Sequence, residues 1–178
     1  CLGLVGSEMC IRYRTCTAYG AVLGNDGRLR FPREVVEKAI EQAEQKLVLH
    51  GQDPKYDRKV YGNREHFATG GAAVMIADSA NNEYRKSTAQ DLYDLSRIVD
   101  ICEHIHIFQR MCVLRDIEDN YEMDLNTTYC SVSGTSKHVG ASWVDHKHLE
   151  KTLEMLHIIA GGEDQWRARP FVSQANCV

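Results

Sequence analysis

The chain contains 178 residues, of which 43% are apolar and 26% are charged, so it is long enough to form a domain with a substantial core. Its net charge of −4 arises in residues 101–178, which carry 7 basic and 11 acidic side chains, because residues 1–100 carry 14 of each. This distribution disfavours nucleic-acid binding, which requires clustered Lys and Arg. No apolar run approaches the roughly 20 residues that span a membrane, and no pattern typical of a signal peptide occurs, so we expect no membrane association.

The cysteines indicate a reducing compartment. Their number is odd, and no Cys-x-x-Cys pair occurs among the seven, which stand at positions 1, 10, 16, 102, 112, 130 and 177. A disulfide framework is the alternative, but this count and spacing do not favour it. We therefore expect reduced thiols and a cytoplasmic protein.

The N-terminal part of the chain combines short strands with one helix. Residues 10–27 are expected to form short extended pieces, and Asn-Asp-Gly at residues 25–27 predicts a turn before a strand at residues 29–31. Pro32 then stands where a helix can begin. Apolar residues at helical spacing predict that this helix continues to about Gln45.

The next stretch is rich in short strands separated by turns. Strands are expected at residues 46–50, 59–61, 65–68 and 73–77. Their frequent interruption predicts an antiparallel arrangement. A capping box at residues 87–90 then predicts the start of another helix. The expected buried side of that helix consists of Leu92, Leu95, Ile98, Val99 and Cys102.

Residues 101–178 alternate between strand and helix. Apolar runs predict strands at residues 105–108, 138–143 and 170–173. Helical spacing between them predicts helices within residues 117–134 and 145–162. This order is typical of an α/β protein with a parallel sheet and crossover helices. Such a sheet must close into a barrel or be covered on both faces, so we interpret the chain as the front part of a larger protein. Residues 1–100 would form a mixed α+β appendage, and residues 101–178 would supply the first three parallel strands.

Two adjacent glycines form the most distinctive local feature. They follow Thr69 as Gly70 and Gly71, between two expected strands. Glycines at such a place let a backbone approach a ligand closely, and a tight connection between strands is the alternative. No glycine-rich nucleotide-binding motif occurs.

Other candidate ligand-binding residues follow the expected strands, because in a parallel barrel the chemistry lies at the carboxyl ends of the strands. Gln109 and Arg110 follow the first strand, Trp143 the second and Asn176 the third. Trp143 can present its ring face to a cation, and a core or interface Trp is the alternative.

An acidic run begins after the first of these strands. Asp116 is a candidate ligand-binding residue at the mouth of the expected barrel. The later carboxylates, Asp124 among them, are expected to offset a helix dipole and face solvent.

The spacing of the histidines in the sequence does not indicate a metal site. His104 and His106 lie two apart on an expected strand, and His146 and His148 lie at an expected solvated helix start. Neither pair has a third ligand at a fixed spacing, and zinc normally needs at least three protein ligands. We therefore expect no bound metal.

Several blocks in one order resemble the trimethylamine methyltransferase family. They are HFATGGAAV at residues 66–74, YRKST at 84–88, DLYDL at 91–95, LHGQDP at 49–54, GRLRFPR at 27–33 and LNTTY at 125–129. The resemblance runs from about residue 11 to the end. It implies an N-terminal part of a TIM (β/α)8 barrel, preceded by a mixed α+β appendage.

The resemblance also implies an activity, which is transfer of a methyl group from a methylated amine to the cob(I)alamin of a separate corrinoid protein. The chain itself would then bind no cofactor tightly. Trimethylamine and a quaternary amine such as glycine betaine both stay open as substrates, because the pyrrolysine that marks trimethylamine-specific members lies on a later strand. We expect a homo-oligomer for the full-length protein and no activity for these 178 residues alone.

Two other classes of protein stay open on the residues themselves. One is a TIM-barrel lyase or aldolase, which would need a Lys at the carboxyl end of a strand, whereas Lys137 lies at a strand start. The other is a non-catalytic binding module on an open α/β sheet, which would protect its sheet edge with charge or Pro.

Overall fold

The computed structural model describes residues 7–174. The chain divides into two compact units, residues 1–45 and residues 46–178. The boundary expected near residue 100, between the α+β appendage and the first three parallel strands, stays a prediction. None of the helices in residues 7–174 combines the length and the apolar character that a membrane crossing requires.

The first unit contains two helices and a small hairpin. Its elements are α1 (Ser7–Ala18), β1 (Val22–Leu23), β2 (Leu29–Arg30) and α2 (Arg33–Gln42). The two strands pair antiparallel around the predicted turn, where Gly27 has a φ of 75°, and α2 begins after Pro32 as expected. The extended conformation predicted from residue 10 is wrong, because residues 10–18 belong to α1. This helix has no apolar stripe, so periodicity gave no signal for it.

The second unit begins with two antiparallel hairpins. Strand β3 (Leu47–Leu49) pairs with β4 (Arg58–Val60), and the 3-10 turn η1 (Pro54–Tyr56) lies between them. Strand β5 (Met75–Asp78) pairs with β6 (Glu83–Lys86) around Asn82, which has a φ of 60°. Both hairpins agree with the predicted antiparallel arrangement, although β6 was not predicted as a strand because its residues are polar and exposed.

The segment between the hairpins runs parallel to the main sheet. Ala68 forms a parallel bridge with Ile107, and Ala73 forms another with Cys112. The prediction of antiparallel pairing is therefore wrong for residues 68–73. Gly70 and Gly71 interrupt this stretch, and Gly71 has a φ of 125°, which leaves isolated bridges in place of a continuous ladder.

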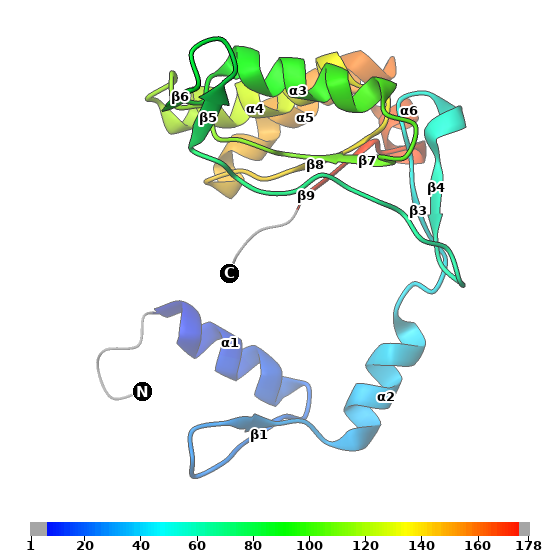
Figure 1. Cartoon of the computed structure of the whole chain (residues 1–178). Coiled ribbons are helices and arrows are strands. Elements are labelled where there is room, and N and C mark those ends of the chain that lie inside the picture. The colour runs from blue at the N-terminus through cyan, green and yellow to red at the C-terminus, as the bar shows by residue number, and fades with distance from the viewer. Residues whose placement is uncertain (1–6, 175–178) are drawn as a thin grey trace. The chain divides into compact units, whose positions relative to one another are not determined.

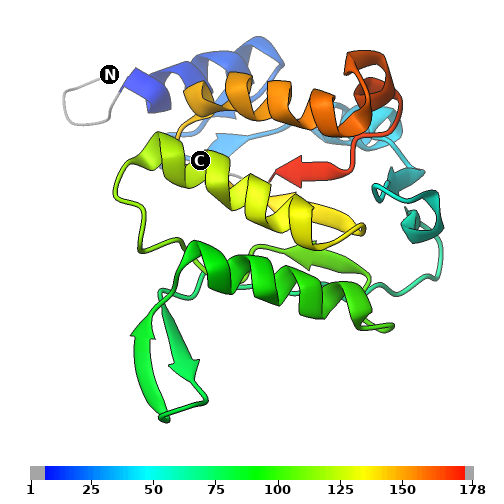
Figure 2. The same cartoon turned by 90° about the horizontal axis from the view of Figure 1, so that it is seen from above.

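Three parallel strands with crossover helices form the centre of the second unit. The strands are β7 (Ile107–Gln109), β8 (His138–Ala141) and β9 (Val172–Gln174), in the order β7-β8-β9. The helices are α3 (Ala89–Ile101), α4 (Asn120–Gly134), α5 (Leu149–Ala160) and α6 (Glu163–Ala168), with η2 (His146–His148) before α5. Helices α3, α4 and α5 lie side by side on one face of the sheet (Figures 1 and 2). This confirms the predicted α/β order, and the strands of residues 7–174 form no closed barrel.

The core lies between the sheet and these helices. Alternate strand residues Phe108, Val139 and Val172 are buried in it together with Leu92 and Leu156. Val99 of α3 is buried as predicted, whereas Ile98 is 55% exposed, which corrects that assignment.

The contact between α3 and α4 explains why Ile98 faces outward. Ser96 is the buried residue on this side of α3, and its hydroxyl donates to the carbonyl oxygens of Tyr93 and Cys130. Gly134 meets Ser96 so closely that a Cβ on Gly134 would collide with the Ser96 side chain. Small residues therefore set this helix packing, and Ile98 lies outside it.

We predict that Gly134→Ala destabilises the protein by about 1–3 kcal/mol, because the new methyl group has no room between α3 and α4. The midpoint of thermal unfolding measures the effect. Gly70→Ala is the matched control, since a Cβ there meets no atom within 4 Å. Equal midpoints for the two variants would contradict the close helix contact.

Candidate functional site

The face of the sheet opposite the helices carries a row of polar and small residues. Register pairs Gln109 with Gly140, and Gly140 with Ser173, across the three strands. Period-two alternation puts these residues on the face away from Phe108 and Val139. Gln109 and Ser173 are exposed, and α3, α4 and α5 all lie on the other face (Figures 1 and 2). We call Gln109, Gly140 and Ser173 the inner-face row.

Thr69 holds the backbone of Gln109, the first residue of the inner-face row. Its hydroxyl accepts a hydrogen bond from the Gln109 N–H at 2.8 Å and donates to the Gln109 carbonyl oxygen at 2.7 Å. The Thr69 N–H also donates to the carbonyl oxygen of Ile107 at 3.2 Å. Gly70 and Gly71 follow directly, and a Cβ on Gly71 would lie 3.4 Å from the Met111 carbonyl oxygen. The structure therefore brings together four predicted site residues at the carboxyl end of β7.

Ser173 and His138 form a second polar contact on the inner face. The Nδ1 atom of His138 lies 2.8 Å from the His50 carbonyl oxygen, and its Nε2 atom lies 2.9 Å from the Ser173 hydroxyl. A carbonyl oxygen only accepts, so Nδ1 carries the proton. Burial lowers the pKa of His138, which favours the neutral ring and leaves Nε2 as an acceptor. The Ser173 hydroxyl therefore donates to His138.

Sequence reasoning missed Gly140, Ser173 and His138. They lie within two of the apolar runs that predicted strands, whereas candidate residues were sought only at the carboxyl ends of those strands. Their positions two residues apart on β8, with a polar residue at the matching position of β9, were the available signal.

Arg110 and Trp143 lie near the strand ends in different roles. The Arg110 N–H donates to the Gly140 carbonyl oxygen at 3.1 Å, and its side chain is half-buried. Trp143 packs against the hydrophobic core, and its indole N–H donates to the Thr128 hydroxyl at 2.9 Å. This placement favours the alternative of a core Trp.

The loop before α5 is anchored by a buried carboxylate. Asp124, only 1% exposed, accepts from the Val144 N–H at 2.8 Å and lies 2.6 Å from Nδ1 of His148. The expectations that Asp124 and His148 face solvent are therefore wrong. The carboxylate is buried because it satisfies the backbone N–H groups of this loop.

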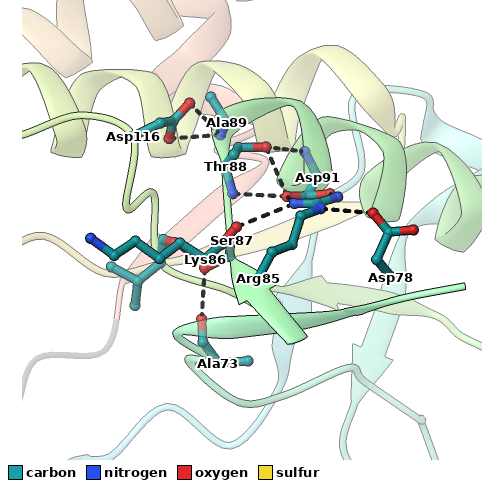
Figure 3. A network of polar contacts seen from close by, with 10 residues as sticks. Ala73, Asp78, Arg85, Lys86, Ser87, Thr88, Ala89, Asp91 and Asp116 are labelled. Carbon is teal, nitrogen blue, oxygen red and sulfur yellow. Dashed lines mark hydrogen bonds and ion pairs between the residues drawn. The ribbon is translucent and has the colours of Figure 1, made fainter. Parts of the chain in front are cut away.

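Asp116 lies at the start of α3. Both carboxylate oxygens accept from the Ala89 N–H, at 3.1 and 3.2 Å (Figure 3). The side chain is exposed, and it offsets the positive end of the helix.

An ion-pair network ties the β5–β6 hairpin to the same helix start (Figure 3). Arg85 donates two hydrogen bonds of 2.7 Å to Asp91 and one of 3.2 Å to Asp78. Asp91 also accepts from the Thr88 backbone and hydroxyl, so the capping box comprises residues 88–91 and not the predicted 87–90. Ser87 is instead buried, and its hydroxyl donates to the Val113 carbonyl oxygen at 2.6 Å.

Asn176, the remaining predicted site residue, lies outside the described residues. Within residues 7–174, no group of three or more His, Cys, Asp or Glu side chains has the arrangement of a metal site. His106 precedes β7, and its Nδ1 atom accepts from the Phe67 N–H at 3.1 Å. Four cysteines, Cys16, Cys102, Cys112 and Cys130, are free thiols, as expected for reduced cysteines. Burial raises the pKa of Cys112 to about 11.

In α/β proteins with parallel sheets, ligands bind at the carboxyl ends of the strands, which is where Thr69, Gly70, Gly71 and Gln109 lie together here. The model of the trimethylamine methyltransferase family (MTTB) matches residues 6–177. The chain therefore belongs to this family.

Individual relatives agree with the family match. The trimethylamine methyltransferase MttB of Desulfitobacterium hafniense (strain DSM 10664 / DCB-2) is 34% identical over 149 residues, covering 84% of this chain and 30% of the relative. The protein of the same name from Methanosarcina thermophila is 26% identical, covering 84% and 32%. The glycine betaine methyltransferase of D. hafniense (strain Y51) is 25% identical, covering 82% and 30%. The chain thus spans about a third of the length of the relatives that it matches.

We predict that Asp91→Asn destabilises the protein near pH 6 by about 1 kcal/mol, a value limited by solvent screening because the Arg85 side chain is 43% exposed. Hydrogen bonds from Arg85 hold the pKa of Asp91 at about 2, below its ordinary value. A lowered folded-state pKa stabilises the fold above the unfolded-state pKa, and this stabilisation is lost as the pH falls through 2. The free energies of unfolding of the wild type and of Asp91→Asn, measured from pH 6 to pH 2, should converge as the pH falls. A difference that stays constant over this range would contradict the ion pair.

We predict that Thr69→Val loosens the edge of β7, because both hydroxyl bonds to Gln109 are lost, at a cost of about 1–2 kcal/mol. Hydrogen exchange of the Gln109 amide should accelerate in this variant and stay slow in Thr69→Ser, which keeps the hydroxyl. Equal exchange rates in wild type and Thr69→Val would show that the contact does not hold the strand.

Proposed function

We propose that the protein containing this chain transfers a methyl group from a methylated amine to the cob(I)alamin of a separate corrinoid protein. The family match over residues 6–177 is the observation that carries the proposal. Trimethylamine and a quaternary amine such as glycine betaine are the candidate donors, because relatives named for each are similar to this chain. The proposal includes a cytoplasmic location, which free thiols at Cys16, Cys102, Cys112 and Cys130 support.

We further propose that the chain is the N-terminal part of a TIM barrel. Three parallel strands with crossover helices on one face support this fold. Because the chain spans about a third of its relatives, the rest of the protein would supply the remaining strand–helix units. The inner face of the sheet would then line the barrel interior, and the fragment alone would be inactive. A homo-oligomer of the complete protein belongs to the same proposal.

Positioning of the donor is the main contribution expected from the protein. The bond from nitrogen to the methyl carbon breaks with its electron pair left on nitrogen, and cob(I)alamin accepts the methyl group, so protonated trimethylamine yields dimethylamine. This displacement needs alignment more than a strong acid or base. Thr69, Gly70, Gly71, Gln109 and Arg110 lie together at the strand end where the amine would bind.

The other proposed binding residues have less geometric support. The polar atoms of Asp116 and Trp143 already bond to Ala89 and Thr128, so they would contribute only their remaining lone pairs or ring face. Asn176 follows β9 in the sequence and would act at the same edge of the sheet.

The aldolase alternative loses support from the environment of Lys137. This Lys is 2% exposed and lies before β8, at the amino end of the sheet. Its ammonium group donates hydrogen bonds of 2.6–2.7 Å to three carbonyl oxygens, those of Val99, Cys102 and Ile105. A Lys that forms a Schiff base needs an accessible amine. Lys137 instead satisfies the carbonyl oxygens at and after the end of α3, so it is not available to a carbonyl substrate. A non-catalytic binding module is the other alternative, and it predicts amine binding without turnover.

Methyl transfer by the full-length protein tests the proposal. We predict that, with its corrinoid protein reduced to cob(I)alamin, it methylates the corrinoid with trimethylamine or glycine betaine as donor. The absorption spectrum of the corrinoid measures the reaction, and residues 1–178 alone serve as the inactive control. Absence of transfer with both amines would refute the activity, and transfer by residues 1–178 alone would refute the need for the rest of the barrel.

A further inference from the structure

We infer that the inner-face row binds the ammonium end of the methylated amine, with the oxygens of Gln109 and Ser173 on either side of Gly140. This inference rests on the proposed function, because it assigns a substrate contact within the same site. It adds Gly140 and Ser173 to the residues that sequence patterns had indicated.

The first support is the free carboxamide of Gln109. The Thr69 hydroxyl holds both backbone polar groups of Gln109, so the residue is fixed at the end of β7. Within residues 13–174, the Gln109 side chain has no hydrogen-bond partner, and it is exposed. A fixed backbone with an uncommitted carboxamide at the carboxyl end of a parallel strand is suited to ligand binding.

Gly140 gives this carboxamide its position. A Cβ built on Gly140 would lie 3.3 Å from Cδ of Gln109, which shows that the carboxamide leans over the middle strand. Any larger residue at position 140 would push the carboxamide away from Ser173. The glycine therefore brings two polar side chains from the outer strands toward each other.

The hydroxyl of Ser173 faces the ligand as an acceptor. Its proton is donated to Nε2 of His138, since Nδ1 of that ring is committed to the His50 carbonyl oxygen. The lone pairs of the Ser173 oxygen are left for a ligand. An oxygen that only accepts attracts an N–H group or the partly positive methyl groups of an ammonium ion, and it repels a carboxylate. The Ser173 oxygen thus favours the cationic end of the amine over the carboxylate end of glycine betaine, and the carbonyl oxygen of the Gln109 carboxamide can be turned toward the same cation.

Binding of tetramethylammonium to the full-length protein, without the corrinoid partner, tests this inference directly. We expect Gln109→Leu and Ser173→Ala each to weaken binding about tenfold, as loss of one favourable contact does. Gly140→Ala should weaken it as well, because the carboxamide must shift. Ser133→Ala on α4, an exposed Ser on the helical side of the sheet, is the matched control and should bind as wild type does.

A charge series separates the two ends of the substrate. Gln109→Glu should tighten binding of tetramethylammonium, and acetate should not compete with this cation in the wild-type protein. Weaker cation binding by Gln109→Glu together with competition by acetate would overturn the inference in favour of the carboxylate end.

Unchanged binding in both Gln109→Leu and Gly140→Ala would also overturn the inference, and these two variants leave the bond between Ser173 and His138 intact. Failure of the proposed function gives a different result, which is absence of methyl transfer by the wild-type protein, so the two failures are distinguishable.

Discussion

The parallel pairing of β7, β8 and β9 constrains the rest of the second unit, because parallel strands need a crossover connection after each strand. Here α4 and α5 with α6 supply the connections, and α3 completes the helical layer on one face (Figure 2). Phe108, Val139 and Val172 fill the space beneath that layer. Because side chains alternate between the two faces along a β-strand, the residues next to these three, Gln109, Gly140 and Ser173, lie on the opposite face. The same alternation therefore determines which residues form the core and which form the inner face.

Polar contacts to the backbone hold the irregular segments around this sheet. Lys137 binds the carbonyl oxygens at the end of α3, and Asp124 binds the N–H groups before α5. Asp91 and Asp116 likewise accept hydrogen bonds from backbone N–H groups at the start of α3. These charged side chains have structural partners that satisfy buried or terminal backbone groups. The three residues of the inner-face row, Gln109, Gly140 and Ser173, are by contrast all neutral.

The sequence predicted the order of elements in the second unit because long apolar periods dominate local structure there. It failed for α1, which has no apolar stripe, and for residues 68–73, whose parallel bridges depend on contacts with residues about 40 positions away. Position after an expected strand indicated both Gln109 and Trp143 as candidate residues, and Asp116 was indicated by the acidic run that follows the first of these strands. Neither signal could reveal the bond from Trp143 to Thr128, because it depends on how α4 crosses the sheet. Gly140 gave no signal by itself, since its role depends on its neighbour in register.

A structure of the full-length protein with tetramethylammonium bound is the most direct measurement of whether this sheet forms part of an amine-binding barrel. We expect further parallel strands to close around the inner face, with the cation against the oxygens of Gln109 and Ser173. An inner face filled by apolar side chains, with the cation bound elsewhere, would contradict this assignment of the site.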